Sequence, residues 1–328
     1  MRGSLWADKV ELARREFVGL CEGIAYGPES TRDELRVLVR AADAEAEETA
    51  RAALGHLAAR FYRLHYGDIW LRDTGPIFVS GQARDGDEAV VTPTVFGFNG
   101  WGNKFELDGD DEVAGAIAAA SDRPARVFPW VLEGGSVDVD GEGTALTTRQ
   151  CLLNANRNPT MDAAAIERAL SEALGVDKLL WLGAGLANDH TDGHVDTLAR
   201  FVAPGVVVAM EPAAGDDPNR DALGRILGDL RSMRDAAGRA LEVVTIPSPG
   251  RVLDDDGQLM PASYVNFYIA NHAVIVPTYG SPADEAAVAR IAALFPGRRT
   301  TGVDGRAILS RGGAFHCITQ QMPRGGAS

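Results

Sequence analysis

The chain has 328 residues, of which 45% are hydrophobic and 24% are charged, the balance of a globular protein with a hydrophobic core. Acidic residues outnumber basic ones by 46 to 32, which gives a formal net charge of -14. A negative field attracts small cations to an acidic cleft, although the simpler interpretation of this excess is solubility. Because no basic stripe is present, we expect no nucleic acid as a partner.

Neither a membrane span nor a signal peptide is visible in the sequence. The longest apolar runs, such as Val206–Met210, fall far short of the roughly 20 residues that cross a bilayer. Asp8, Glu11 and Arg14 interrupt the apolar residues of the N-terminus, which is not typical of a secretory signal. We therefore predict a cytoplasmic protein without a membrane partner.

The predicted elements alternate between helices and short strands. Val10, Phe17, Cys21 and Ile24 share one face of a first helix, which places Cys21 in the core. Further helices are predicted at 43–59, 111–120, 161–174, 219–237 and 282–295. Strands are predicted at 60–66, 77–80, 89–95 and 178–182, and hairpins at 201–208 and 264–276. Since no linker divides the chain, we expect one α/β domain over 1–323, followed by a disordered tail at 324–328.

Polar segments recur after these helices and strands at intervals of about 50 to 70 residues. Their markers are Asp73, Glu133, His194, Asn266 and Cys317. The spacing suggests a cyclic array of similar units whose polar ends meet in the middle. A doubly wound sheet is the alternative, because any mixed α/β chain alternates in this way.

Three cysteines at wide spacings exclude a disulfide framework and a paired CxxC zinc site. Cys151 precedes two leucines and is predicted to be packed, like Cys21. Cys317 follows Gly312 and Gly313 and is adjacent to His316, an unusually polar setting for a structural thiol. Glycines allow a ligand to approach closely, and a neighbouring cationic group favours the thiolate. Cys317 is therefore the candidate nucleophile.

His194 and Asp196 would point to the same side of a strand, where they would form an acid–base pair. A structural role is the alternative for so short a motif. His190 and His194, with neighbouring aspartates, also have the composition of a metal site. The intervening residues are poor helix material and no further ligand cluster is evident, so we expect no metal and no other cofactor.

Two carboxylates complete the candidate site. Asp73 stands between Arg72 and Thr74, just before an apolar strand, and Glu133 precedes Gly134. Carboxylates at such positions can accept paired hydrogen bonds from a planar guanidinium group. The alternative for either residue alone is a capping or turn role.

Together these segments resemble the agmatine deiminase family, which is related to bacterial peptidylarginine deiminase. The matching stretches occur in order and span nearly the whole chain: 67–76, 98–104, 132–136, 140–144, 151–159, 191–196, 261–271 and 316–321. The resemblance implies a five-bladed, pseudo-symmetric α/β propeller (a pentein fold) with the active site on its central axis.

The resemblance also implies a role for each matching residue. Cys317 corresponds to the nucleophile and His194 to the general acid–base. Asp73 and Asp196 correspond to the carboxylates that hold the guanidinium group. Glu133 and Trp70 are further expected substrate contacts. The implied reaction hydrolyses agmatine to N-carbamoylputrescine and ammonia through a covalent thiouronium intermediate, in polyamine (putrescine) biosynthesis, without metal or organic cofactor.

Several positions depart from the family pattern and concern the substrate more than the reaction: His190, Thr197, His272, Arg311 and Ala314. The family's first strand also has no counterpart at the N-terminus. The alternatives are therefore a deiminase of arginine or peptidyl-arginine, a metal-dependent hydrolase that releases urea, and a non-catalytic binding protein. The oligomeric state stays open, with a homodimer among the alternatives.

Overall fold

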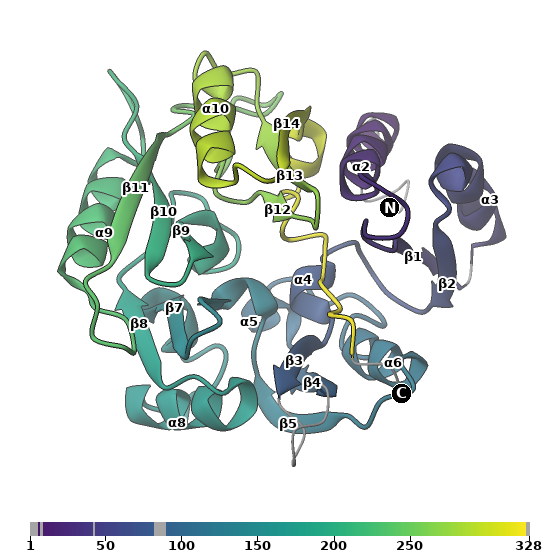
Figure 1. The fold of residues 1–328 in the computed structure, drawn as a ribbon, viewed down its shortest axis with the longest axis horizontal. Coiled ribbons are helices and arrows are strands. Elements are labelled where there is room, and N and C mark those ends of the chain that lie inside the picture. The colour runs from purple at the N-terminus through teal and green to yellow at the C-terminus, as the bar shows by residue number, and fades with distance from the viewer. Residues whose placement is uncertain (1–5, 7–8, 42, 82–89, 326–328) are drawn as a thin grey trace.

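The computed structural model describes residues 6, 9–41, 43–81 and 90–325. It has a mixed α/β fold built from five small sheets, which confirms the predicted class. The sheets follow one another around the middle of the molecule in chain order, with most of the longer helices on the outside (Figure 1). No helix in the described residues is long and apolar enough to cross a membrane.

Four of the sheets share one plan. A first strand pairs antiparallel with a second, and a helix then leads to a third strand that pairs parallel with the second. Their strands are β3 (Ile77–Gly81), β4 (Val90–Gly97) and β5 (Arg126–Val131); β6 (Asp138–Val139), β7 (Thr144–Thr148) and β8 (Lys178–Leu182); β9 (Ala199–Ala203), β10 (Val206–Glu211) and β11 (Glu242–Pro247); and β12 (Tyr268–Ile269), β13 (Ala273–Thr278) and β14 (Arg299–Asp304).

The helices between the second and third strands cover the sheets, and two of them, α8 and α9, are clearly amphipathic. They are α6 (Val113–Ala120), α8 (Ala163–Leu174), α9 (Arg220–Ser232) and α10 (Asp284–Leu294). The second strands are the most buried, and five consecutive residues of β13 are inaccessible to solvent. The core is therefore made of these second strands and the inner faces of the helices.

The first sheet has two strands among the described residues, β1 (Arg36–Arg40) and β2 (Arg60–Leu64), which pair parallel. They are joined by α3 (Ala44–Leu54) and the short η2 (Gly55–Leu57). The predicted lack of the family's first strand concerns residues around 1–5 and 7–8, which lie outside the described part of the chain. So do residues 326–328 of the predicted tail.

Helix α2 (Val10–Ile24) joins the beginning of the chain to the last sheet. It packs against β13, β14 and α11 (Arg306–Leu309). The Glu16 carboxylate accepts hydrogen bonds of 2.8 Å from the backbone N–H groups of Ala307 and Ile308 at the start of α11. These contacts hold α2 beside the last sheet (Figure 1).

The short segments that precede the four first strands carry four of the five polar residues singled out above. Asp73 lies in α4 (Leu71–Thr74), and Glu133 stands before η3 (Gly134–Ser136) and β6. His194 stands before η4 (Val195–Thr197) and β9. Asn266 precedes β12, and Cys317 follows α11. Equivalent positions of successive sheets are thus presented to the same central region. The remaining short helices are α5 (Gly100–Asn103) and α7 (Arg149–Leu152).

Three predicted elements differ from the structure. The helix predicted at 43–59 ends at Leu54, where the short η2 takes over. The helix predicted at 219–237 ends at Ser232, because Met233 is extended and a bridge pairs Arg234 with Ala240. The hairpin predicted at 264–276 is confirmed only from Tyr268, because residues 264–267 form a buried turn rather than a strand.

Candidate active site

Cys317 lies in the loop after α11 and is 6% exposed. Its Sγ is 3.2 Å from Asn266 Nδ2 and 3.6 Å from Asp196 Oδ2. A Cβ built on Gly313 would lie 3.2 Å from the same sulfur, so a side chain there would crowd the thiol. Burial raises the Cys317 pKa well above its usual value, and the carboxylates of Asp196 and Asp73 raise it further. In the protein without substrate, the sulfur is therefore a protonated thiol.

Asp196, in η4, is the carboxylate next to this thiol. Its Oδ2 accepts hydrogen bonds from His316 Nδ1 at 2.7 Å and from Asn266 Nδ2 at 3.1 Å. Its Oδ1 is buried and has no partner among the described residues. Burial raises the Asp196 pKa to about 6. Because unpaired buried acceptors are rare in folded proteins, this oxygen points to a ligand.

Asp73 presents a second buried carboxylate. Its Oδ2 accepts a hydrogen bond of 2.9 Å from the indole Nε1 of Trp101, and its Oδ1 accepts one of 2.9 Å from the backbone N–H of Gly135. Burial raises the Asp73 pKa; His194 opposes this shift and Glu133 adds to it. Within the described residues, neither Asp73 nor Asp196 forms an ion pair with a lysine or arginine.

Gly135 marks the point where these groups converge. A Cβ built on it would lie 2.6 Å from His194 Nδ1, 2.9 Å from Asp73 Oδ1 and 3.2 Å from Asp196 Oδ2. Residues from two different segments, α4 before β3 and η4 before β9, therefore surround one glycine. Any larger residue at position 135 would displace at least one of them.

His194 is buried between two carboxylates. Its Nδ1 lies 3.7 Å from Asp73 Oδ1 and its Nε2 lies 3.6 Å from Glu133 Oε2. Both distances exceed a hydrogen bond, and neither ring nitrogen has another hydrogen-bond partner among the described residues. Burial lowers the His194 pKa, but Asp73, Cys151 and Glu133 outweigh this and raise it well above the usual value. The ring is therefore held as a cation.

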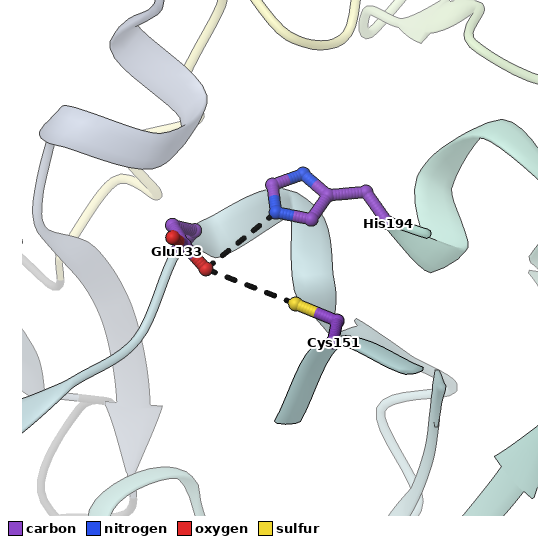
Figure 2. Close-up of side chains that lie close together, drawn as sticks. All are labelled: Glu133, Cys151 and His194. Carbon is purple, nitrogen blue, oxygen red and sulfur yellow. Dashed lines mark hydrogen bonds and ion pairs between the residues drawn. The ribbon is translucent and has the colours of Figure 1, made fainter. Parts of the chain in front are cut away.

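Figure 2 shows the other side of this histidine, where Glu133 faces both His194 and Cys151. Cys151 Sγ lies 3.9 Å from Glu133 Oε2, and the residue is 0% exposed. Arg157 Nε donates to Glu133 Oε1 at 3.0 Å, and its Nη1 pairs with Asp192. Although burial favours the neutral acid, His194 and Arg157 lower the Glu133 pKa below its usual value. Glu133 is thus a buried anion that already has a cationic partner.

Trp70 packs close to the loop that carries Cys317. A Cβ on Gly313 would lie 2.6 Å from Trp70 Cζ3, and the indole Nε1 donates to Asp68 Oδ2 at 3.1 Å. The tryptophan is buried and stacks on Trp6, with ring centroids 6.4 Å apart. It supports the loop around the thiol from behind the glycine.

The structure brings together five of the residues singled out in the sequence: Cys317, His194, Asp73, Asp196 and Glu133. Two supporting interpretations were wrong. His194 and Asp196 do not lie in a strand but at the start of the short helix η4, and both still face Gly135. His316 does not favour the Cys317 thiolate, because burial and the cations Arg200, Arg72 and His194 lower the His316 pKa well below its usual value.

Several contacts of the site were missed. His316 and Asn266 hold Asp196, Trp101 holds Asp73, and Arg157 holds Glu133. The sequence marked Asn266 only by its spacing, and Arg157 only as part of the matching stretch 151–159. A polar residue within or beside each matching stretch was the available signal, but the partners are too distant in sequence to be paired by pattern.

The metal site weighed at His190 and His194 is not assembled. The His190 ring lies 5.8 Å from the Phe105 ring, and Asp192 pairs with Arg157 and with Lys104. A different cluster, Glu133, Cys151 and His194, brings three ligand atoms within 4.8 Å of one another.

Comparison with known proteins places this geometry in context. Residues 1–323 match the family model described as Porphyromonas-type peptidyl-arginine deiminase. The agmatine deiminase of Stutzerimonas stutzeri is 38% identical over 342 residues, covering 97% of this chain and 89% of the relative. That of Pseudomonas aeruginosa is 40% identical over 299 residues, covering 84% of this chain and 80% of the relative.

Solved structures of agmatine deiminases are also similar to this chain. The agmatine deiminase of Enterococcus faecalis superposes with a TM-score of 0.86 at 32% identity, covering 97% of this chain and 89% of that one. A cysteine-to-serine variant of the Campylobacter jejuni agmatine deiminase with substrate bound superposes with a TM-score of 0.83 at 27% identity, covering 98% and 90%.

Proposed function

Because this chain belongs to the Porphyromonas-type peptidyl-arginine deiminase family, we propose that it is an agmatine deiminase that uses Cys317 as its nucleophile. One observation carries the proposal. Two buried carboxylates, Asp73 and Asp196, flank a thiol, and neither pairs with a lysine or arginine in the described part of the chain. A cationic, planar guanidinium group supplies the missing charge and the missing hydrogen-bond donors.

Binding prepares both the substrate and the thiol. The guanidinium nitrogens donate to Asp73 and to the unpaired Oδ1 of Asp196, which aligns the central carbon with Cys317 Sγ. The bound cation also offsets the two negative charges that raise the Cys317 pKa. The thiol proton therefore passes to solvent and the thiolate forms when the substrate is in place, whereas the empty enzyme stores an unreactive thiol.

The first chemical step exchanges a nitrogen for sulfur. Cys317 Sγ bonds to the guanidinium carbon, and a terminal nitrogen leaves as ammonia after accepting the proton of His194. The raised His194 pKa keeps that proton available until it is needed. A thiouronium bonded to Cys317 remains.

The second step restores the enzyme. His194, now neutral, accepts a proton from water while the water oxygen bonds to the thiouronium carbon. The remaining hydroxyl proton passes to Cys317 Sγ as the carbon–sulfur bond breaks, which restores the thiol and releases the ureido product. Glu133, held by Arg157, stabilises the imidazolium that forms again. The net change is agmatine plus water to N-carbamoylputrescine plus ammonia, and no metal or organic cofactor takes part.

The cations that could hold a substrate carboxylate are mostly engaged elsewhere. Arg157 is buried on Glu133, and Arg149 stacks over Trp181, with its Cζ 5.3 Å from the ring centroid. Arg311, exposed on the loop before Cys317, is the remaining candidate. An amine tail, as in agmatine, needs no such partner, which favours agmatine over arginine.

We further propose that the five sheets are blades of one pseudo-symmetric propeller, a single domain over 1–323 with the site on its axis. The shared strand plan of four sheets supports this arrangement, as does the position of the site residues before the first strands. We also propose Trp70 as part of the pocket wall.

A competition assay tests the substrate. With equal concentrations of agmatine and arginine, mass spectrometry should detect N-carbamoylputrescine in at least tenfold excess over citrulline, with ammonia and no urea. If citrulline is the main product, the substrate is arginine rather than agmatine, and the proposed reaction type, deimination, still holds. Urea as the product would contradict the thiol mechanism itself.

A further inference from the structure

Glu133, Cys151 and His194 form a compact, fully buried group of three chemically different ligands (Figure 2). Glu133 Oε2 lies 3.6 Å from His194 Nε2 and 3.9 Å from Cys151 Sγ. All three ligand atoms lie within 4.8 Å of one another. The deiminase chemistry proposed above uses His194 and Glu133 but gives no role to the Cys151 thiol.

The spacing suits a tetrahedral metal ion. Zinc binds thiolate sulfur at about 2.3 Å, and imidazole nitrogen and carboxylate oxygen at about 2.0–2.2 Å. Such bonds place neighbouring ligand atoms roughly 3.3 to 3.7 Å apart in a tetrahedron. The observed separations of 3.6 and 3.9 Å therefore need only small side-chain movements.

His194 provides an independent indication. Both of its ring nitrogens are buried and have no hydrogen-bond partner among the described residues. Its Nε2 faces Glu133 Oε2, the oxygen shared with Cys151. Once it has lost its proton, an unpaired imidazole nitrogen directed at a carboxylate and a thiol can bind a metal.

The charges also balance. A Cys151 thiolate and the Glu133 carboxylate together neutralise a divalent cation. Arg157 contacts Glu133 chiefly at Oε1, at 3.0 Å, and orients Oε2 toward the cluster. Such outer contacts commonly fix the orientation of metal ligands. A water molecule would complete the tetrahedron.

We propose that Glu133, Cys151 and His194 form an inhibitory site for a thiophilic divalent cation, with Zn²⁺ as the fitting ion. Binding forms metal–sulfur, metal–nitrogen and metal–oxygen bonds and releases two protons to solvent, one from the Cys151 thiol and one from His194 Nε2. The bound ion takes up the His194 nitrogen that the proposed deiminase reaction needs for proton transfer, so turnover stops. The inhibitory effect rests on the proposed function, whereas the metal binding does not.

Inhibition kinetics test the effect. Zn²⁺ should inhibit the wild-type enzyme reversibly, with activity restored by EDTA. Cys151→Ser should raise the Zn²⁺ concentration for half-inhibition at least tenfold, each variant being compared with its own metal-free rate. Cys21→Ser is the matched control, because Cys21 is equally buried but distant from the cluster, and its inhibition should equal that of the wild type. Equal inhibition of Cys151→Ser and wild type would overturn the proposal.

Binding is tested separately in a protein that cannot turn over. Co²⁺ added to Cys317→Ser should produce a thiolate-to-cobalt charge-transfer band in the near ultraviolet. This band should disappear in Cys317→Ser/Cys151→Ser and persist in Cys317→Ser/Cys21→Ser. Absence of the band in Cys317→Ser, or its persistence without Cys151, would overturn the site whatever the enzyme's substrate is. If Cys151→Ser fails to fold by circular dichroism, Cys151→Ala serves in its place.

Discussion

The two sides of His194 carry the same types of residue but differ in one component. On one side Cys151 lies beside Glu133, and Arg157 fills the space between Glu133 and Asp192. On the other side Cys317 lies beside Asp196, whose Oδ1 is unpaired in the described structure. Both thiols are buried among carboxylates, and both have a raised pKa.

The difference lies in the guanidinium group. On the Cys151 side, the guanidinium group of Arg157 is held between two carboxylates. On the Cys317 side, Asp73 and Asp196 have no guanidinium partner in the described structure. Loss of Arg157 would leave Glu133 as an uncompensated buried charge, whereas the carboxylates without a partner are available to a substrate of the same chemistry. The Arg157 side thus shows, within the same molecule, how a guanidinium group is held.

Replacing the two thiols should separate the two sides most clearly. Cys317→Ser should lower the rate of ammonia release on the order of 10³-fold or more, since the hydroxyl is a far weaker nucleophile at this position. Substrate should still bind, because both carboxylates remain. A variant that keeps more than a few per cent of wild-type activity would exclude Cys317 as the nucleophile.

Asp73→Asn removes the charge of one of the two carboxylates that have no lysine or arginine partner, and it keeps the side-chain shape. A lost charge-assisted hydrogen bond costs about 1.5–3 kcal/mol, so kcat/KM should fall about 10- to 150-fold. Steady-state kinetics should show effects on both KM and kcat. An unchanged kcat/KM would remove Asp73 from the substrate site.

A lower pH should reduce kcat/KM through protonation of Asp196, on the Cys317 side of His194. Because burial raises its pKa to about 6, this carboxylate becomes protonated, and loses its charge, as the pH falls below that value. We expect kcat/KM to decrease about tenfold per pH unit below pH 6. The Asp196→Asn variant should be slower and should lack this acidic limb. An acidic limb that persists in the variant would assign the titration to another group.

Replacement of the Cys151 thiol should change the stability of the protein rather than its chemistry. Cys151→Ser places a hydroxyl in a 0% exposed site, which should lower the free energy of unfolding by about 1–3 kcal/mol. Cys21→Ser should act similarly, because Cys21 is 1% exposed in the core. Denaturant titration measures both. A stability equal to wild type would indicate that Cys151 is not packed.

The smallest expected effect is that of chelation. Prolonged dialysis against EDTA should leave the rate of ammonia release unchanged, since neither side requires a metal for turnover. Inactivation that added metal reverses would contradict the thiol mechanism and favour a metal-dependent reaction.

Sequence patterns predicted the elements with strong periodicity. Residues Lys178–Leu182 form a strand with the predicted bounds, and Val10–Ile24 form the predicted first helix. Helix α9 ends early because a local bridge at Arg234 competes with helical pairing, which periodicity does not register. Long-range pairing decides such boundaries.

The same limit applied to the site. Cysteine, histidine and aspartate are residue types that commonly take part in catalysis, so Cys317, His194 and Asp73 could be identified as candidates from the sequence. The pairing of Arg157 with Glu133 depends on how different segments meet in space. A list of residues therefore did not reveal which carboxylates already hold a cation and which are open.

The docking of α2 onto β13 and β14 has a consequence for folding kinetics. Glu16 in α2 meets Ala307 and Ile308 across nearly the whole sequence, so these contacts have a very large sequence separation. Chains dominated by such distant contacts fold slowly, because loop-closure entropy must be overcome before the contacts stabilise the chain. The individual strand–helix–strand units can form early, but α2 acquires its partner only once the last sheet exists. Docking of α2 onto the last sheet and α11, the helix that precedes the Cys317 loop, is thus expected to be a late event of folding.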